Sequence, residues 1–498
     1  MGKCSLGCLH LSPVMLLVYF CVLNILMYLD RGVLSSLLPA LQDDTRMHLS
    51  DFQSGILGSV FMFGFMIASP IFAYSSQSVH PFNLIAIGIA IWGGAVLFAA
   101  VSRRFWTLAA ARMLSGIGEA SFVCLASPIL LSIAPSSKKN LWISIFYSAL
   151  TIGYALGYVI APPVKNSFNG WYVVFYFEAV ASIPFVLIAL FAYKDPKLIF
   201  KKENKVPIVV QFKALKRKPV FVLLVLGYGA YSFTVGGIAH WGPTMLQKQF
   251  SKGETTATFS LGAITIISGL FATVLGSVLY EKMIKPYRLQ FENREIESRK
   301  FDYFRTEKAA KFALLVTSIA CVIGCIGAII APTLGEPVYE IPFVAFLFCV
   351  ALAEFSLFLG VGPLNVGIMA SVDEELRPQA VAVNIFFMHL FGDFPSPFLI
   401  GAVNGGIGRY WGTVLTMSWL IFTVTFWSLA FNFSRFHGAP WEYIRKNFCS
   451  RDIIKADREQ RLLTADKDSI REDLPYFQEQ NEKSVNKSIE KSIDEEMK

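Results

Sequence analysis

Apolar runs long enough to cross a bilayer recur along most of this chain, separated by short polar segments with charge, Pro or Gly. About 20 residues of α-helix match the thickness of the hydrocarbon core. A helix also satisfies its own backbone hydrogen bonds, as the bilayer requires. The pattern predicts twelve transmembrane helices, near residues 13–41, 52–77, 82–102, 105–133, 139–164, 170–193, 219–250, 256–281, 309–331, 341–371, 376–403 and 409–434.

The runs form two groups of six, separated by a short basic segment that Pro196 and Pro207 interrupt. Two parallel six-helix repeats are typical of one large class of transporters. We therefore expect an all-α membrane protein whose last segment is polar enough to be disordered. The expected parts are a cytosolic N-terminus (1–12), an N-terminal six-helix bundle (13–193), a cytosolic basic linker (194–218), a C-terminal six-helix bundle (219–434) and a cytosolic tail (435–498).

Composition supports a membrane protein and excludes several functions. Of the 498 residues, 16% are charged, against about 25% in soluble domains. The net charge of +8 is concentrated in the segments 194–218 and 282–311, which we interpret as cytosolic loops beside anionic lipid headgroups. Both termini are then cytosolic, and nucleic-acid binding is not expected.

The sequence lacks the patterns of an enzyme. We find no nucleophile–base pair, metal-ligand set or phosphate-binding loop in the polar segments, so we expect no catalytic residues, cofactor or metal. The eight cysteines lie in apolar runs or near the ends that we place in the cytosol. Disulfides are therefore not expected.

Four charged residues stand inside apolar runs of the first half: Asp30 and Arg31 in the first run, Arg112 and Glu119 in the fourth. A charge at membrane depth costs at least about 2.5–3.5 kcal/mol and normally faces a partner or a water-filled cavity. Arg112 and Glu119, seven residues apart, share one helical face. We expect a buried, hydrogen-bonded cluster in which a carboxylate exchanges a proton as its surroundings change. A structural ion pair that only orients helices is the alternative.

Around these charges the sequence resembles the Spinster family of the major facilitator superfamily. The resemblance is carried by Tyr28-Leu-Asp-Arg31, by Arg112-Met-Leu-Ser-Gly-Ile-Gly-Glu119-Ala-Ser121, and by the eleventh run, His389-Leu-Phe-Gly-Asp393-Phe-Pro-Ser396-Pro-Phe-Leu-Ile-Gly401. It implies the major facilitator fold, alternating access, and transport of lysophospholipid or sphingoid phosphate, driven in some members by protons out of lysosomes.

The resemblance also implies residue roles. Asp30 and Arg112 carry proton coupling, with Glu119 supporting them, and we expect Arg31 and Arg112 near the lipid phosphate. Three departures bear on gating and substrate. Residues 73–81 lack the charged Gly-x-x-x-Asp-Arg pattern of that loop, His240 replaces an aromatic residue, and the 282–311 segment is unusually long.

Further candidates lie in the second half. His389 and Asp393 are four residues apart on one helical face. We favour a structural or gating hydrogen bond there, together with Ser396, over direct substrate contact. Glu354 is a lone acid in an apolar run, with substrate binding and helix packing as open alternatives. His240 and Trp241 are candidates for an aromatic site that binds a cationic headgroup, with an interfacial anchor as the alternative.

Together these features predict a proton-coupled transporter of a single-chain phospholipid or sphingoid lipid, acting as a monomer. We expect it in the lysosomal or late endosomal membrane, with the plasma membrane as the alternative. Two other functions stay open: the same fold carrying a sugar, amino acid or organic anion, and a membrane receptor that transports nothing.

Overall fold

The computed structural model describes residues 11–76, 78–135, 139–191, 208–331 and 340–435, which form helices joined by short connections. The first six helices are α1 (Pro13–Asp43), α2 (Asp51–Ser75), α3 (Pro81–Val101), α4 (Phe105–Ile133), α5 (Lys139–Ser167) and α6 (Tyr172–Phe191). The remaining elements are α7 (Ile208–Lys216), α8 (Pro219–Thr244), η3 (Met245–Gln249), α9 (Glu254–Ile267), η4 (Ser268–Ala272), α10 (Thr273–Glu292), α11 (Ser298–Ile330), α12 (Glu340–Ala370), η5 (Glu374–Leu376), α13 (Arg377–Met388), η6 (His389–Asp393), α14 (Pro395–Gly406), α15 (Arg409–Ser418) and α16 (Leu420–Arg435).

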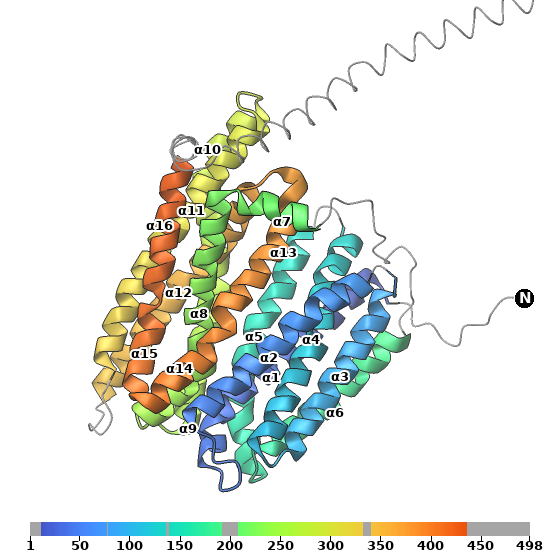
Figure 1. Cartoon of the computed structure of the whole chain (residues 1–498), viewed down its shortest axis with the longest axis vertical. Helices are drawn as coiled ribbons and strands as arrows, with labels where there is room; N and C mark the ends of the chain where they lie inside the picture. Colours follow the sequence, from blue (N-terminus) through green and yellow to red (C-terminus); the bar gives the residue numbers. More distant parts are fainter. Residues whose placement is uncertain (1–10, 77, 136–138, 192–207, 332–339, 436–498) are drawn as a thin grey trace, which may run out of the picture. The chain divides into compact units, whose positions relative to one another are not determined.

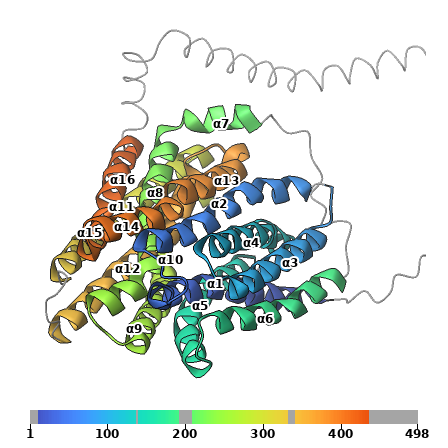
Figure 2. The same cartoon turned by 60° about the horizontal axis from the view of Figure 1, so that its bottom comes forward.

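Twelve helical segments of the described chain are long and apolar enough to cross a membrane, which confirms the predicted fold class. Six of them are α1 to α6. In Figure 1 these helices (blue to teal) lie on the right and α8 to α16 (green to red) on the left, and Figure 2 shows the same division. The short helix α7 lies within the expected basic linker, and its Phe212 stacks on Phe387 of α13 with ring centroids 6.2 Å apart.

The prediction of a long loop over 282–311 was wrong. Helix α10 continues to Glu292 and α11 already begins at Ser298, so only residues 293–297 connect them. Two aromatic stacks join the helical extensions, Tyr287 with Phe304 and Phe291 with Phe301. The many charged residues of this segment predicted a loop. Its aromatic residues, however, give the two helical extensions an apolar contact.

Three transmembrane segments of the second half contain a turn of π-helix: η3, η4 and η6. Such turns are rare in α-helices and often occur at functional sites. The element η6 consists of His389–Asp393, so two of the three candidate residues of the eleventh segment, His389 and Asp393, lie in it.

Glycine lets the helices of each half approach closely. A Cβ atom at Gly32 of α1 would lie only 2.1 Å from the carbonyl oxygen of Tyr154 on α5. Helices without side-chain volume at the crossing gain close van der Waals contact, which drives helix association in lipid. Gly153 and Gly157 of α5 likewise approach the backbone of α1, and Gly276 of α10 approaches that of α12.

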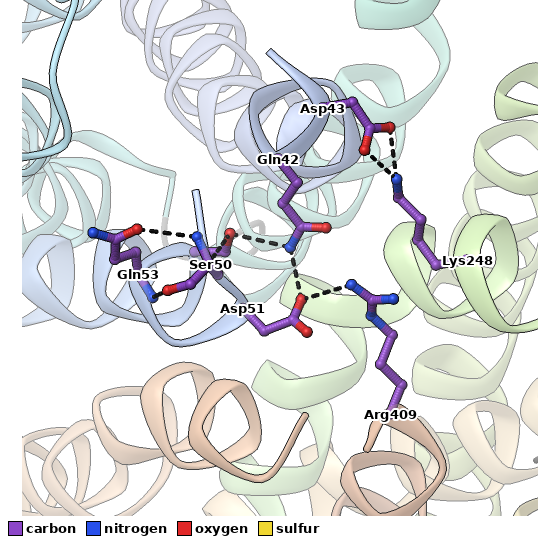
Figure 3. A network of polar contacts seen from close by, with 8 residues as sticks. Gln42, Asp43, Ser50, Asp51, Gln53, Lys248 and Arg409 are labelled. Carbon is purple, nitrogen blue, oxygen red and sulfur yellow. Dashed lines mark hydrogen bonds and ion pairs between the residues drawn. The ribbon is translucent and has the colours of Figure 1, made fainter. Parts of the chain in front are cut away.

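The two halves contact each other near the α1–α2 connection, and we call this end of the bundle the α1–α2 end. Lys248 of η3 binds both carboxylate oxygens of Asp43 at 2.6 Å, and Arg409 lies 3.1 Å from Asp51 (Figure 3). Gln42 donates to the same Asp51 oxygen at 2.8 Å. A network of charges and amides therefore joins α1 and α2 to the second half.

Backbone contacts reinforce this closure. The Ser59 hydroxyl on α2 donates to the Phe394 carbonyl at 2.7 Å, and the Tyr158 hydroxyl on α5 donates to the Ala239 carbonyl at 2.5 Å. A Cβ atom at Gly55 would lie 2.2 Å from the Pro397 carbonyl oxygen, so α2 and α14 touch there. The structure is thus closed between its halves at the α1–α2 end.

At the opposite end, the ion pairs of the described residues join elements of the same half. Lys218 pairs with Asp373 at 2.8 Å, and Arg377 pairs with Asp302 at 2.5 Å. The expected cytosolic N-terminus falls almost entirely, and the expected tail wholly, outside the described residues, as do residues 194–207 of the expected linker. Those predictions therefore stay predictions.

Candidate functional site

Two buried ion pairs connect α1 and α4 inside the first half. Nη1 of Arg112 lies 2.7 Å from Oδ1 and 2.9 Å from Oδ2 of Asp30. Nη2 of Arg31 lies 2.5 Å from Oε1 of Glu119. All four side chains are buried. The cluster that the sequence predicted is therefore present, and adjacent residues of α1 serve two different partners on α4.

Helix geometry explains this pairing. Arg112 and Glu119 share a face of α4 but differ in height by about 10 Å, at 1.5 Å per residue. Asp30 and Arg31, adjacent on α1, bind Arg112 and Glu119 respectively at these two heights. Close packing holds the face in place, since a Cβ atom at Gly116 would lie 2.0 Å from the Phe61 carbonyl oxygen of α2.

Arg31 has an aromatic surrounding. Its Cζ atom lies 4.6 Å from the ring centroids of both Tyr28 and Phe61, and 6.0 Å from that of Phe65. Guanidinium groups are attracted to aromatic faces, most strongly where water is excluded. The Arg31 side chain is 9% exposed and that of Arg112 only 1%. Arg31 is therefore the more accessible cation of the cluster.

A fifth charged side chain, that of Glu178, was not among the candidates singled out from the sequence. Glu178 on α6 is buried and lies beside Asp30 and Arg112. Neither of its carboxylate oxygens has a hydrogen-bond donor among the described residues. The signal in the sequence was a lone acid in an apolar run, the same signal that singled out Glu354.

In the second half, η6 holds a compact polar group. Nδ1 of His389 lies 2.7 Å from Oδ2 of Asp393, as the four-residue spacing allowed. The Ser232 hydroxyl of α8 donates to Oδ1 of Asp393 at 2.5 Å. The His389 ring also meets Phe65 edge-on across the halves, with centroids 5.3 Å apart. This group therefore faces the ring that borders Arg31.

Ser396 and Glu354 lie apart from ion pairs in the described chain. The Ser396 hydroxyl is fully buried without a described hydrogen-bond partner, and a Cβ atom at Gly236 would lie 3.1 Å from it. Glu354 of α12 is buried and accepts a hydrogen bond from the Thr265 hydroxyl of α9 at 3.3 Å.

His240 and Trp241 lie in the contact between the halves. Nε2 of His240 is 3.0 Å from the carbonyl oxygen of Ser54. The Trp241 indole is fully buried and donates to the Pro397 carbonyl at 3.0 Å. A buried indole cannot act as the interfacial anchor that the sequence also allowed. In this conformation both residues support the closed α1–α2 end, and neither ring is open to a headgroup.

The described residues contain no group of three or more His, Cys, Asp or Glu side chains that could hold a metal ion. Cys21, Cys124, Cys321, Cys325 and Cys349 are free thiols.

Comparisons with known proteins agree with this architecture. The model of the Major Facilitator Superfamily matches residues 20–397. The chain is 31% identical over 453 residues to the probable sphingolipid transporter spinster homolog 2 of Arabidopsis thaliana, covering 84% of this chain and 87% of that protein. It is 26% identical over 426 residues to protein spinster homolog 1 of Homo sapiens (80% and 75%). It is 25% identical over 409 residues to the sphingosine-1-phosphate transporter SPNS2 of Danio rerio (78% and 76%).

The fold also matches solved structures. A bacterial homolog of the human lysosomal transporter Spinster, in an inward-facing and unoccupied conformation, superposes with a TM-score of 0.66 at 19% identity, covering 85% of this chain and 97% of that chain. The nucleoside transporter NupG gives a TM-score of 0.58 at 15% identity, covering 84% of this chain and 98% of that chain. At these identities the likeness concerns the fold alone.

The fold, the paired charges inside it and the superfamily match define a membrane transporter, not an enzyme. Within the major facilitator superfamily, the chain belongs to the Spinster family.

Proposed function

We propose that this transporter moves a single-chain lipid with a phosphate headgroup, a lysophospholipid or a sphingoid phosphate, by alternating access. The observation that carries the proposal is Arg31, a buried guanidinium that is bordered by three aromatic rings and is less deeply buried than that of Arg112. Two relatives that match most of the chain are named for sphingolipid and sphingosine-1-phosphate transport, which supports this substrate class.

The chemistry of Arg31 suits a phosphate. A guanidinium offers a planar set of donors that binds two phosphate oxygens at once. Nη2 of Arg31 donates to Glu119, while its Nε–H has no described acceptor. Arg112 is committed to both oxygens of Asp30. In our proposal Arg31 makes the first contact with the phosphate, and Arg112 follows only when Asp30 releases it.

We infer that transport is coupled to protons at Asp30. Protonation neutralises the carboxylate, weakens its hold on Arg112 and frees that cation for an anionic headgroup. Proton binding and lipid binding then strengthen each other, because coupling between two sites is reciprocal. Glu119 has the same relation to Arg31 and is the second candidate, followed by Glu354.

For location, we propose a lysosomal or late endosomal membrane, with the basic linker and both termini in the cytosol. The Lys and Arg excess of the segments 194–218 and 282–311 supports this orientation. The α1–α2 end then faces the lumen, and the contacts described above close this conformation on the luminal side. Epitope tags in the linker are expected to be labelled only after the plasma membrane is permeabilised, and labelling on intact cells contradicts the orientation.

Reconstitution tests the function. Purified protein in proteoliposomes is given labelled lysophosphatidylcholine, sphingosine-1-phosphate, or a panel of sugars, amino acids and organic anions, with and without a pH gradient. We expect uptake of at least one lipid and acceleration by the gradient. Uptake of a polar solute alone points to the same fold with a different cargo, and no uptake of any compound favours a non-transporting receptor.

Two variants connect this assay to the site. Asp30→Asn keeps the shape of the side chain but cannot ionise, so we expect lipid exchange without the pH response. Asp373→Asn is the matched control, because it removes an exposed ion pair with Lys218 inside one half. If Asp30→Asn keeps the full response to the pH gradient, the coupling residue is Glu119 or Glu354 instead. A wild type that ignores the gradient is a uniporter.

A further inference from the structure

Glu178 is a buried acid without a counter-charge of its own. Its side chain belongs to α6 and is only 3% exposed. Both carboxyl oxygens lack a donor among the described residues, although the carboxyl lies within hydrogen-bonding reach of Asp30. Helices α1 and α6 are held together about 10 Å further along α6, at 1.5 Å per residue, where the Tyr19 hydroxyl donates to the Phe185 carbonyl at 2.9 Å.

The charges of this cluster balance only if one acid is protonated. Three carboxyl groups, those of Asp30, Glu119 and Glu178, share two guanidinium groups, those of Arg31 and Arg112. With every group ionised the cluster carries one net negative charge. Burying an uncompensated charge costs several kcal/mol, so a group in that position takes up a proton instead.

Of the three acids in the cluster, Glu178 is the one whose surroundings favour the protonated, neutral form. Asp30 receives both hydrogen bonds from Arg112, and Glu119 receives one from Arg31, so each has a cation. Glu178 has neither a cation nor a donor in the described chain. When Glu178 is protonated, its O–H group can donate a hydrogen bond to the Asp30 carboxylate. This satisfies the buried hydroxyl without disturbing the Arg112 pair.

We propose that Glu178 carries the resident proton of the charged cluster and passes it to Asp30. In that step the Glu178 O–H bond breaks, an O–H bond forms on Asp30, and Glu178 is left as the carboxylate. The negative charge thereby moves from Asp30 to Glu178 and Arg112 is released from its first partner. Glu178 lies six residues inside α6, about 9 Å from the α1–α2 end at 1.5 Å per residue.

The surroundings of Glu178 support this role. Asp30 on α1 and Arg112 on α4 are the charged groups that face it. Helix α3, which packs along α6 with Gly93 against Ser182, contains no titratable residue. Phe168, just after the end of α5, contacts Phe177 of α6. Proton exchange at Glu178 is therefore tied to Asp30 and its arginine.

Infrared spectroscopy tests the resident proton directly. Full-length protein in lipid nanodiscs at neutral pH is compared with Glu178→Gln, which has the shape of the protonated acid. We expect the variant to fold with an unchanged melting temperature and to lose one carboxylic-acid carbonyl band. Glu281→Gln is the control, since Glu281 is exposed and pairs with Arg288. It should lose a carboxylate band only.

Asp30→Asn makes the test sharper. Removing that charge leaves two acids for two arginines, so Glu178 should ionise and its acid band should also disappear. A Glu178 that is only a packing residue does not respond in this way. The proposal is overturned if Glu178→Gln loses a carboxylate band, or if Asp30→Asn keeps the acid band.

The role in coupling rests on the proposed function and is tested separately. In proteoliposomes, Glu178→Gln should exchange labelled lysophospholipid but lose the acceleration by a pH gradient. If wild type transports none of the lipids, the proposed function is wrong. The infrared result still shows whether Glu178 is protonated. If wild type responds to the gradient and Glu178→Gln responds equally, the role of Glu178 in coupling is wrong.

Discussion

Lys248 and Asp43, which are 205 residues apart in the chain, form an ion pair between the two halves, with the Lys248 ammonium 2.6 Å from each carboxylate oxygen. Arg409 and Asp51 form a second pair beside it (Figure 3). Alternating access requires the halves to separate at this end at some stage of the cycle. The sequence lacks the charged pattern that usually holds the opposite end, so these pairs favour the conformation seen here.

Lys248→Glu should therefore open the α1–α2 end more often. Losing a partly exposed attraction of about 0.2–1 kcal/mol and gaining a repulsion of similar size shifts the population roughly two- to thirtyfold. The measurement is the labelling rate of Ser59→Cys, a buried position in the contact, by a membrane-impermeant thiol reagent. Exchanging the charges, Lys248→Asp with Asp43→Lys, should restore slow labelling. Lys218→Glu, in the comparable pair within one half, should leave it unchanged.

Arg112→Ala should abolish transport and destabilise the fold, because it leaves Asp30 buried without a cation. Breaking a buried pair in this way costs about 3–5 kcal/mol. Arg112→Lys should retain part of the activity, since one nitrogen of Arg112 serves both Asp30 oxygens and a lysine ammonium can do the same. Thermal unfolding and lipid uptake are measured for both variants. Equal losses in the two variants contradict this account of the pair.

His389 distinguishes gating from substrate binding. Its ring bonds Asp393 within η6 and meets Phe65 across the halves. If the residue acts in gating, His389→Ala should lower the maximal transport rate roughly three- to tenfold at nearly constant KM. Ser232→Ala, which removes the other partner of Asp393, should act in the same direction and more weakly. A rise in KM without a change in maximal rate assigns His389 to direct substrate contact.

Asp44, in the α1–α2 connection, gives a pH-dependent contribution to stability. Burial alone would raise the pKa of Asp44, but hydrogen bonds from the backbone N–H groups of Met47 and Arg46 and from the Trp171 indole outweigh it and lower the pKa. A lowered pKa in the folded state stabilises the protein above the unfolded-state pKa, near 3.8, and this stability is lost as pH falls through the folded-state value.

Asp44→Asn should therefore lower the free energy of unfolding by about 1 kcal/mol at neutral pH. The difference from wild type should shrink toward zero as the pH falls below about 4. Trp171→Phe, which removes one donor and keeps a ring, should show a smaller effect with the same trend. Thermal unfolding across a pH series measures both. A constant difference at every pH means that Asp44 acts through its shape alone.

Several features of this protein follow from the sequence by itself. Apolar runs must become helices in lipid, because no water is present to satisfy the backbone, and this determined twelve transmembrane segments. The high cost of charge at membrane depth singled out Asp30, Arg31, Arg112 and Glu119, and helical periodicity put Arg112 and Glu119 on one face. The four-residue spacing of His389 and Asp393 likewise anticipated their contact.

The tertiary structure decided what depends on helices far apart in the chain. Which arginine pairs with which acid follows from how α1 and α4 cross, and sequence spacing carries no information about that crossing. Glu178 gained its significance only when α6 packed beside Asp30, since the burial and partners of a lone acid are properties of its neighbours. The closed α1–α2 end, with His240 and Trp241 inside it, depends on how the two halves meet. A π-helical turn such as η6 cannot be predicted from the spacing of apolar residues, because the same residues are compatible with an α-helix.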